Sequence, residues 1–315
     1  MSAEPLELPK RAQRKFRPDR IGLYAALIIS SLIMAFPLLF SLSGSVSSLE
    51  DYIRTPWFPI PYQFTLDNYL RVIFDITSSS LSPVMLWVRN TLIRAAWYII
   101  IPAIVAVMGG YVFAKLRFKG RDSAFLYLLS SMMLPGIVFQ IPTFVMMARW
   151  PLMGGNDIYG QGGQGMINQW PSLLITGLVN VFYIFMFRQT FVTIPGDFEE
   201  AARVDGAGTL RCLWDVYLPM LKPTLVVLII FQFVAIWNDY LWPTFVVTGN
   251  KDLWVLAQGF QYLALASTTL KGMPGVTDYP FTFAMAMFTV LPLIFIYLFM
   301  QRYFVEGVQG FAIKG

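Results

Sequence analysis

The sequence predicts an all-α polytopic membrane protein, and both its composition and its pattern support this fold class. Hydrophobic residues make up 57% of the 315-residue chain and charged residues only 13%, whereas charged residues are about 25% of a typical soluble domain. The apolar residues also come in long blocks. A bilayer core about 30 Å thick needs about 20 helical residues to cross it, and we therefore expect six transmembrane helices.

The expected spans are apolar blocks of about that length. Two of them contain a charged residue away from their ends. Arg94 lies near the start of the second span, and Asp239 lies in the fifth. Prolines occur within several blocks, but neighbouring helices in a membrane bundle can satisfy the carbonyl groups that a proline leaves free. The prolines therefore do not argue against spanning helices. The six spans are residues 21–43, 91–113, 123–148, 170–188, 223–247 and 279–302.

The distribution of Lys and Arg predicts the orientation in the membrane. If the N-terminal extension, residues 1–20, is cytoplasmic, 16 of the 23 Lys and Arg residues lie on the cytoplasmic side, in agreement with the positive-inside rule. Both termini are then cytoplasmic, including a C-terminal tail of residues 303–315. The first apolar block exceeds the roughly 7–15 residues of a signal-peptide core, so we expect a retained span of a multi-pass inner-membrane protein.

The residue inventory excludes several kinds of function. The chain has no histidine and one cysteine, Cys212, so it cannot supply a His general base, a Cys/His zinc site or an internal disulfide. Its net charge of +5 comes from membrane-flanking Lys and Arg rather than from a basic face interleaved with aromatic residues. We therefore expect no catalytic residues, no metal site and no nucleic-acid partner.

Nucleotide binding by this chain is not expected either. The phosphate-binding pattern G-x-x-x-x-G-K-[ST] is missing from the sequence, because no glycine is followed by lysine. Residues 160–165 match G-x-G-x-x-G, but they follow no predicted strand and have no acidic residue about 20 positions downstream. We interpret residues 154–165 as a flexible loop on the outer side, either solvated or touching a partner.

Residues 194–222, between the fourth and fifth spans on the cytoplasmic side, form the coupling segment. Asp197 with Glu200 is close to a capping box, which predicts a helix that starts near Phe198. Small residues on this helix would let it lie close against a partner, and its charged residues would fix the register by ion pairing.

The second half of the coupling segment predicts another short helix. Gly206 bends the chain, and Thr209 is expected to cap a helix over residues 210–217. The residues alone leave open an ordinary amphipathic loop that rests on lipid headgroups.

A motif in the coupling segment resembles a known family. The pattern E-A-A, three residues, G, nine residues, V-x-L-P is similar to the EAA signature of the permease subunits of ABC importers, and it falls on Glu200, Ala201, Ala202, Gly206, Val216, Leu218 and Pro219. Residues 237–243 and 301–315 resemble the carbohydrate-uptake branch, particularly its MalG-like subunits. The resemblance covers most of the chain from about Asn90 onwards.

The resemblance implies an importer with several subunits. These are this chain, a homologous MalF-like permease, two ATPase subunits that bind ATP-Mg, and an extracytoplasmic solute-binding protein, while this chain holds no cofactor. The outer loop of residues 248–278 would face the binding protein. The element that docks on the ATPase would comprise Glu199, Glu200, Ala201, Ala202, Asp205, Gly206, Leu218 and Pro219. The tail that reaches into the ATPase dimer would include Glu306, Gly310 and Lys314.

Polar residues within the spans are candidates for a solute path. A charge within the bilayer usually faces a cavity or a partner, and aromatic planes beside a carboxylate or amide suit the faces and hydroxyls of a sugar. The candidates are Trp237, Asn238, Asp239, Tyr240, Gln140 and Asn180. An alternative, which we favour slightly, is that Asn238 and Asp239 hold the helices together, with a salt bridge to Arg94. Arg89 and Arg94 are otherwise interpreted as interfacial residues that extend toward the bilayer surface.

The proposed role is that of a permease subunit for a sugar or related polyol. The main alternative is a secondary transporter that works alone on an ion gradient, which would need inverted repeats and intramembrane acidic residues. No repeat stands out, and Asp239 is the one acidic residue available within the expected spans. The solute itself is not specified, and oligosaccharides, monosaccharides, polyols and glycerol phosphate all remain possible.

Overall fold

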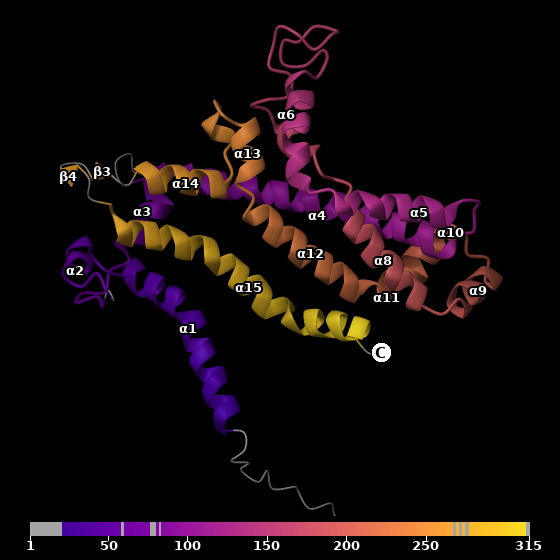
Figure 1. Cartoon of the computed structure of the whole chain (residues 1–315), viewed down its shortest axis with the longest axis horizontal. Coiled ribbons are helices and arrows are strands. Elements are labelled where there is room, and N and C mark those ends of the chain that lie inside the picture. The colour runs from indigo at the N-terminus through magenta and orange to yellow at the C-terminus, as the bar shows by residue number, and fades with distance from the viewer. Residues whose placement is uncertain are drawn as a thin grey trace, which may run out of the picture.

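The structure is a computed structural model, which describes residues 21–57, 60–75, 80–81, 83–266, 269–270, 273–274 and 277–312. The expected N-terminal extension, residues 1–20, lies outside the described residues. Helices dominate, as the sequence predicts. The central helix is α4 (Pro83–Lys115), against which α8 (Val181–Thr193) and α12 (Lys222–Trp237) pack, while α15 (Tyr279–Ala312) packs against α12 (Figure 1).

Three helices are long and apolar enough to cross a bilayer. They are α1 (Ile21–Ser45), α4 and the first 23 residues of α15, and each contains a proline without breaking. Two bent helix pairs raise the number of candidate spans to five within the described residues if each pair counts as one span. The polytopic all-helical class is therefore confirmed, while the number of six spans stays a prediction.

The expected third span, residues 123–148, is not one helix. It consists of α5 (Arg121–Ser130), two short 3-10 turns, η2 (Ser131–Met133) and η3 (Gly136–Phe139), and α6 (Gln140–Ala148), and its two halves are bent by 86°. The bend occurs at Leu134, which has extended backbone angles of φ −90° and ψ 122°. A residue that precedes proline is pushed out of the helical region by the proline ring, and Pro135 follows it.

The expected fourth and fifth spans are also interrupted. Residues 170–188 comprise the five-residue helix α7 (Trp170–Leu174), a non-helical stretch over residues 175–180, and the start of α8. Residues 223–247 comprise α12, a break over residues 238–240 and α13 (Leu241–Val246). The prediction of one continuous helix in each block is wrong, because apolar length does not show where side chains replace the helical partners of backbone carbonyls.

The coupling segment is helical along most of its length. It contains α9 (Asp197–Val204), α10 (Thr209–Arg211), a π-helical turn (Cys212–Tyr217) and α11 (Leu218–Met220). The part from residue 209 to residue 220 meets α12 at an angle of 77°. The segment therefore leaves the direction of α12 and lies, with α9, at one end of the molecule (Figure 1).

The opposite end of α4 is surrounded by short elements. These are α2 (Leu49–Arg54), α3 (Asp67–Ile73), the 3-10 turn η5 (Lys251–Leu253), α14 (Leu256–Ala266) and two hairpins of two-residue strands, β1 (Phe74–Asp75) with β2 (Ser80–Leu81) and β3 (Thr269–Leu270) with β4 (Met273–Pro274). Arg71 on α3 forms an ion pair of 2.8 Å with the buried carboxylate of Asp278, just before α15. This pair joins α3 to the segment that directly precedes α15.

The glycine-rich loop over residues 149–169 is compact, and the expectation of a flexible loop finds no support in its bonding. The side-chain amide of Asn156 donates to the carbonyls of Ala148 and Trp150, both at 3.0 Å, and its oxygen accepts from the backbone N–H of Gly163 at 2.9 Å. Gly154 has φ +56°, and a Cβ there would lie 2.0 Å from the carbonyl oxygen of Gly165. The glycines therefore allow two backbone segments of the loop to approach each other closely.

The C-terminal tail continues α15 without a break as far as Ala312. Glu306 and Gly310 lie on this helical extension, and Lys314 lies outside the described residues. In Figure 1, α15 runs from the end that carries the hairpins toward the end that carries α9.

Two main hydrophobic clusters form the core, and α4 contributes to both. The first gathers around Trp87, Leu173 and Trp242, and the second around Tyr111 and Phe187. Trp87 and Tyr111 both belong to α4. One continuous helix therefore connects the two ends of the molecule.

Candidate functional site

The helix α9 begins at Asp197, one residue before the start that the sequence predicts. Its N-cap is Gly196, with helical angles of φ −67° and ψ −25° and no side-chain capping bond, and Asp197 is already the first helical residue. The expected capping box is therefore wrong, because Gly196 continues the helical turn and leaves Asp197 no cap position to occupy. Its acidic residues in the first turn still favour the helix through its dipole.

The end of α9 is a Schellman motif at Gly206. The N–H of Gly206 donates to the carbonyl of Arg203 at 3.0 Å, and the N–H of Ala207 donates to the carbonyl of Ala202 at 2.9 Å. Gly206 has φ +81° and nothing lies within 4 Å of a Cβ built on it. The motif requires a left-handed residue at this position, so the bend predicted at Gly206 is confirmed.

The second helix begins with Thr209, which makes no side-chain capping bond, since the N-cap is Gly208. The expected cap at Thr209 is therefore wrong, although the helix predicted over residues 210–217 is present and extends to Met220. Its π-helical turn ends at Tyr217, just before Pro219, a residue that lacks an N–H for the regular helical pattern.

Glu199 connects α9 to α4 and to the π-helical turn through hydrogen bonds. Its carboxylate accepts hydrogen bonds from the hydroxyls of Tyr217 at 2.7 Å and Tyr111 at 3.2 Å, and it forms an ion pair with Arg203 at 2.7 Å. Only 14% of the Glu199 side chain is exposed. Burial by itself raises the pKa of this carboxyl, but the hydrogen bonds from Arg203, Tyr217 and Tyr111 outweigh it and hold the pKa below its ordinary value.

The remaining residues expected in the coupling element divide by exposure. Ala202 and Leu218 are half-buried, and the exposed members are Glu200, Ala201, Asp205, Gly206 and Pro219. Large apolar side chains are exposed beside them, namely Phe198, Val204, Leu210 and Trp214, of which Val204 is 88% exposed. Glu199 points into the molecule instead, so a contact between its carboxylate and a partner has no support in the geometry.

A cavity of about 520 Å³ lies where the three interrupted segments meet α4. We call it the central cavity. Non-helical backbone at membrane depth is tolerated where it is buried in protein or lines a water-filled cavity, and each of the three breaks contributes to this wall. The lining residues are Arg94, Tyr98, Gly136, Phe139, Gln140, Thr143, Met146, Met147, Ile175, Thr176, Gly177, Ile236, Asp239 and Trp242.

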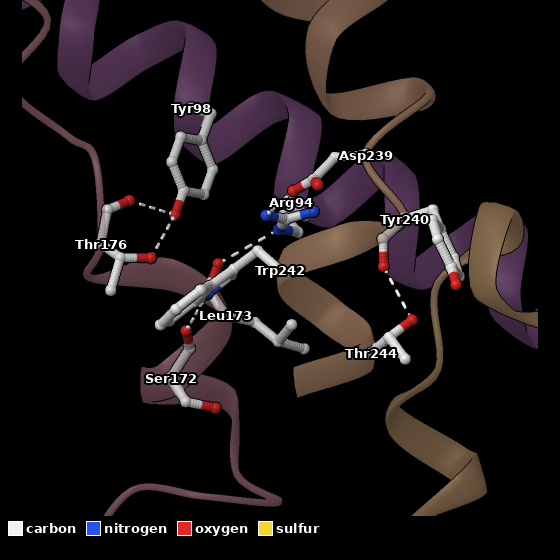
Figure 2. A network of polar contacts seen from close by, with 9 residues as sticks. All are labelled: Arg94, Tyr98, Ser172, Leu173, Thr176, Asp239, Tyr240, Trp242 and Thr244. Carbon is white, nitrogen blue, oxygen red and sulfur yellow. Dashed lines mark hydrogen bonds and ion pairs between the residues drawn. The ribbon is translucent and has the colours of Figure 1, made fainter. Parts of the chain in front are cut away.

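Side chains from α4 and α13 satisfy the carbonyl groups at the end of α7. Arg94 Nε donates to Leu173 at 3.2 Å, Trp242 Nε1 donates to Ser172 at 2.8 Å, and the Tyr98 hydroxyl donates to Thr176 (Figure 2). Trp97 Nε1 donates to Leu174 at 2.9 Å. The last carbonyls of a helix have no partner within it, so these four donors explain why the chain can stop being helical here.

Arg94 and Asp239 form an ion pair across the central cavity wall. Arg94 Nη2 lies 2.5 Å from Asp239 Oδ2, and the side chains are 2% and 23% exposed, respectively (Figure 2). The alternative in which Asp239 bridges to Arg94 is therefore confirmed, and the interfacial position expected for Arg94 is wrong. The carboxylate neutralises the guanidinium inside the protein, so the side chain has no need to reach the bilayer surface. Arg89, in contrast, is exposed as expected.

The structure brings together only some of the residues expected in a solute path. Asp239 and Gln140 line the central cavity. Trp237 is buried and donates to the carbonyl of Thr289 at 2.9 Å, and Asn238 is exposed and donates to Val234 at 2.8 Å. Because Asn238 bonds to its own helix, α12, the expectation that it holds two helices together is wrong.

Two further candidates, Asn180 and Tyr240, take part in local hydrogen bonds that involve the backbone. The side chain of Asn180 caps α8 by accepting from the N–H of Phe182, and the carbonyl of Tyr240 accepts from the hydroxyl of Thr244. Neither residue lines the central cavity.

Sequence reasoning missed several residues of the cavity wall, notably Tyr98, Thr143 and Thr176. One signal was available for Arg94, since Arg94 and Asp239 are opposite charges within two expected spans. For the threonines and Tyr98, no pattern in the sequence distinguishes them from other polar residues that bridge helices.

Comparison with known proteins adds a family match. The family model described as "Binding-protein-dependent transport system inner membrane component" matches residues 106–310. A permease protein of the sn-glycerol-3-phosphate transport system of Brucella abortus is 28% identical, with 90% of this chain and 93% of that protein covered. A permease protein of the diacetylchitobiose uptake system of Streptomyces coelicolor is 29% identical, with 89% and 84% covered.

A solved structure has a similar fold. It is the crystal structure of a bacterial ABC transporter involved in the import of the acidic polysaccharide alginate, with a TM-score of 0.75 and 22% sequence identity. The alignment covers 92% of this chain and 99% of that chain.

Proposed function

Because the chain belongs to the family of inner membrane components of binding-protein-dependent transport systems, we propose that it is a permease subunit of an ABC importer for a sugar or related polyol. A second, MalF-like permease completes the translocation path. The relatives support this solute class, since the two named above belong to uptake systems for diacetylchitobiose and for sn-glycerol-3-phosphate.

The energy for transport comes from two partner ATPase subunits. This chain contains no G-x-x-x-x-G-K-[ST] pattern, so ATP-Mg binds to those partners and this chain carries no cofactor of its own. The excess of Lys and Arg on one side supports cytoplasmic N- and C-termini. The coupling segment and the C-terminal extension of α15 then face the ATPases, and the loop over residues 248–278 faces the binding protein.

The observation that carries the proposal is that α4 links the two candidate sites. Arg94 and Tyr98 of α4 line the central cavity, and Tyr111 of α4 holds Glu199 of the coupling segment. No break separates them along the helix. At 1.5 Å per residue, Arg94 and Tyr111 are about 25 Å apart along the axis, so a displacement of α9 can act on the cavity through one stiff element.

Transport then follows alternating access. The ATPases contact the exposed residues of the coupling segment, and their closure on ATP moves this segment against α4. A ligand shifts such an equilibrium only through different affinities for the two states. The loaded binding protein and ATP must therefore both favour the outward-facing form.

The test is a substitution that alters the coupling segment and leaves the cavity intact. Gly206→Pro removes the N–H that bonds Arg203 and forces φ from +81° toward about −65°. In proteoliposomes that hold the complete transporter and its binding protein, we expect insertion and assembly to persist while uptake and receptor-stimulated ATPase activity are lost.

Gly208→Pro is the matched control, since Gly208 already has φ −72°. We expect this variant to retain most of the uptake. Normal uptake and ATPase stimulation by Gly206→Pro would show that the coupling assignment is wrong.

A further inference from the structure

The two charges of the central cavity are not equally accessible. The Asp239 side chain is 23% exposed, whereas the Arg94 side chain, which lines the same cavity, is 2% exposed. Arg94 Nη1 is buried and has no hydrogen-bond partner among the described residues, while Nε is bonded to Leu173 and Nη2 to Asp239. A solute in the cavity can therefore contact more of the carboxylate than of the guanidinium.

The ion pair holds this carboxylate in place. A buried guanidinium without its partner is strongly destabilised, so the contact of 2.5 Å with Arg94 positions the Asp239 side chain. The pair as a whole has no net charge, which gives an anionic solute no net attraction to offset the loss of its own hydration. The nearest charged atoms that such a solute meets are carboxylate oxygens, and like charges placed together cost several kcal/mol.

A neutral polyhydroxylated solute avoids both problems. One of its hydroxyls can donate to Asp239, and the half-buried side chains of Gln140 and Thr143 on α6 supply further donors and acceptors. Tyr98 and Trp242 add aromatic surface, which suits the apolar faces of a sugar ring. The polar groups are therefore arranged for hydroxyls rather than for a carboxylate or a phosphate.

We propose that Asp239, positioned by Arg94, is a specificity-determining contact that selects neutral glycosides or polyols and excludes anionic ones. This inference rests on the proposed function, because it assumes that the central cavity is the chain's part of the solute path. Asp239 contacts the solute, and Arg94 is a positioning residue. The proposal separates this chain from the acidic polysaccharide named for the structurally similar transporter and from the phosphate ester named for the relative from Brucella abortus.

The test measures solute binding without the receptor and without ATP. Saturation-transfer NMR on the detergent-purified complex with both permeases and the ATPases would compare glycerol, maltose and cellobiose with glycerol 3-phosphate and the uronic acids of the two disaccharides. We expect the neutral member of each pair to bind at least about tenfold more tightly, which corresponds to roughly 1.4 kcal/mol. Asp239→Asn leaves the guanidinium uncompensated, and it should reduce this preference by at least about tenfold or invert it.

Two further variants keep the test informative if Asp239→Asn is unstable. The double variant Arg94→Gln/Asp239→Asn keeps the cavity uncharged with two amides, and it should weaken neutral sugars without gaining binding of the acids. Asn238→Ala changes the adjacent residue, which does not line the central cavity, and it should leave the preference unchanged. A purely structural role of the pair would change assembly or stability and leave the ratio of neutral to acidic binding unchanged.

Three results would overturn the inference. They are tighter binding of the acids by the wild-type complex, no binding of any neutral probe at millimolar concentration, and an unchanged ratio in both Asp239 variants. Failure of the proposed function is seen separately, as missing ATP-dependent uptake or full activity of Gly206→Pro, because the NMR measurement requires neither ATP nor the binding protein.

Discussion

Two apolar stretches of comparable length, one with a single proline and one with two, take different forms in this molecule. Residues 91–113 contain Pro102 and remain part of one helix, α4, whereas residues 123–148 contain Pro135 and bend by 86°. Pro102 is buried within the bundle, and Pro135 is exposed, follows the extended residue Leu134 and precedes Gly136. A proline alone therefore does not decide whether an apolar stretch breaks, and its surroundings do.

The continuous helix and the interrupted segments also have different roles. The continuous helix connects the coupling segment with the central cavity, and the interrupted segments form the cavity wall. A break exposes backbone groups that neighbouring side chains must satisfy, and α4 supplies three of the four donors to the end of α7. The stiff helix thus stabilises the irregular segments.

The largest effect on stability is expected from removing Arg94, the side chain of α4 that bonds two of these segments. Arg94→Ala leaves the carbonyl of Leu173 unbonded and Asp239 without its counter-charge. Breaking one partner of a buried pair is expected to lower the free energy of unfolding by about 3 kcal/mol, measured by unfolding of the purified chain in detergent. Arg89→Ala, at an exposed site on the same helix, should change it by less than about 0.5 kcal/mol.

A smaller loss is expected at the contact between α4 and α8. A Cβ at Gly110 would lie 2.7 Å from Phe187 Cβ and 2.9 Å from the backbone nitrogen of Arg188, so Gly110→Ala must displace α8 and should destabilise by about 2 kcal/mol. At Gly109 the nearest atom is the end of the Ile184 side chain at 3.2 Å. Unfolding measurements on both variants test this, and equal losses would contradict the close approach.

A smaller effect, which depends on pH, is expected at the hydrogen bonds of Glu199 that join α9 to α4. Glu199→Gln removes the charge from the hydrogen bonds to Tyr217 and Tyr111 and should destabilise the docked α9 by about 1.5 kcal/mol, seen as faster amide exchange across α9. Glu200→Gln, at an exposed position, is the control.

The pH dependence of this link follows from the lowered pKa of Glu199. A depressed carboxyl pKa contributes stability above its ordinary value and loses it as the pH falls through the lower, folded value. Protection of α9 from exchange should therefore stay constant at neutral pH and decline only in acid. A decline between pH 6 and 8 would point to a different group.

The smallest change in stability is expected where the two prolines themselves are replaced. Pro102→Ala should alter the free energy of unfolding by less than about 1 kcal/mol and leave uptake unchanged, because α4 is already helical. Pro135→Ala with Gly136→Ala favours a straight helix and should reduce uptake by closing one side of the central cavity. Uptake assays in proteoliposomes distinguish the two, and equal uptake would mean that the bend is not needed.

The sequence predicts the long helices well because their signal is long and local. The residues 21–43, 91–113 and 279–302 lie within helices that extend beyond them. It also predicts α9 and the bend at Gly206, since short-range turn chemistry determines both. These features depend on residues close together in the chain.

The central cavity depends on residues far apart in the chain, and this explains what could not be predicted. The bonds from Arg94 to Leu173 and from Trp242 to Ser172 join residues 79 and 70 positions apart. Hydropathy shows that residues 170–188 are apolar, but it does not show that donors from α4 and α13 replace the helical partners of their carbonyls. The opposite charges of Arg94 and Asp239 were the one long-range signal in the sequence.

The glycine-rich loop has a practical consequence for experiments on the intact transporter. Its two sides are joined by Asn156 and by close backbone contacts at Gly154, while Ile158 and Tyr159, in the turn between Asp157 and Gly160, are 64% and 77% exposed. The loop projects beyond α6, away from the bundle (Figure 1). An epitope or a fluorophore inserted between Ile158 and Tyr159 should therefore report the location of this loop in living cells, whereas the same insertion beside Gly154 would disrupt it.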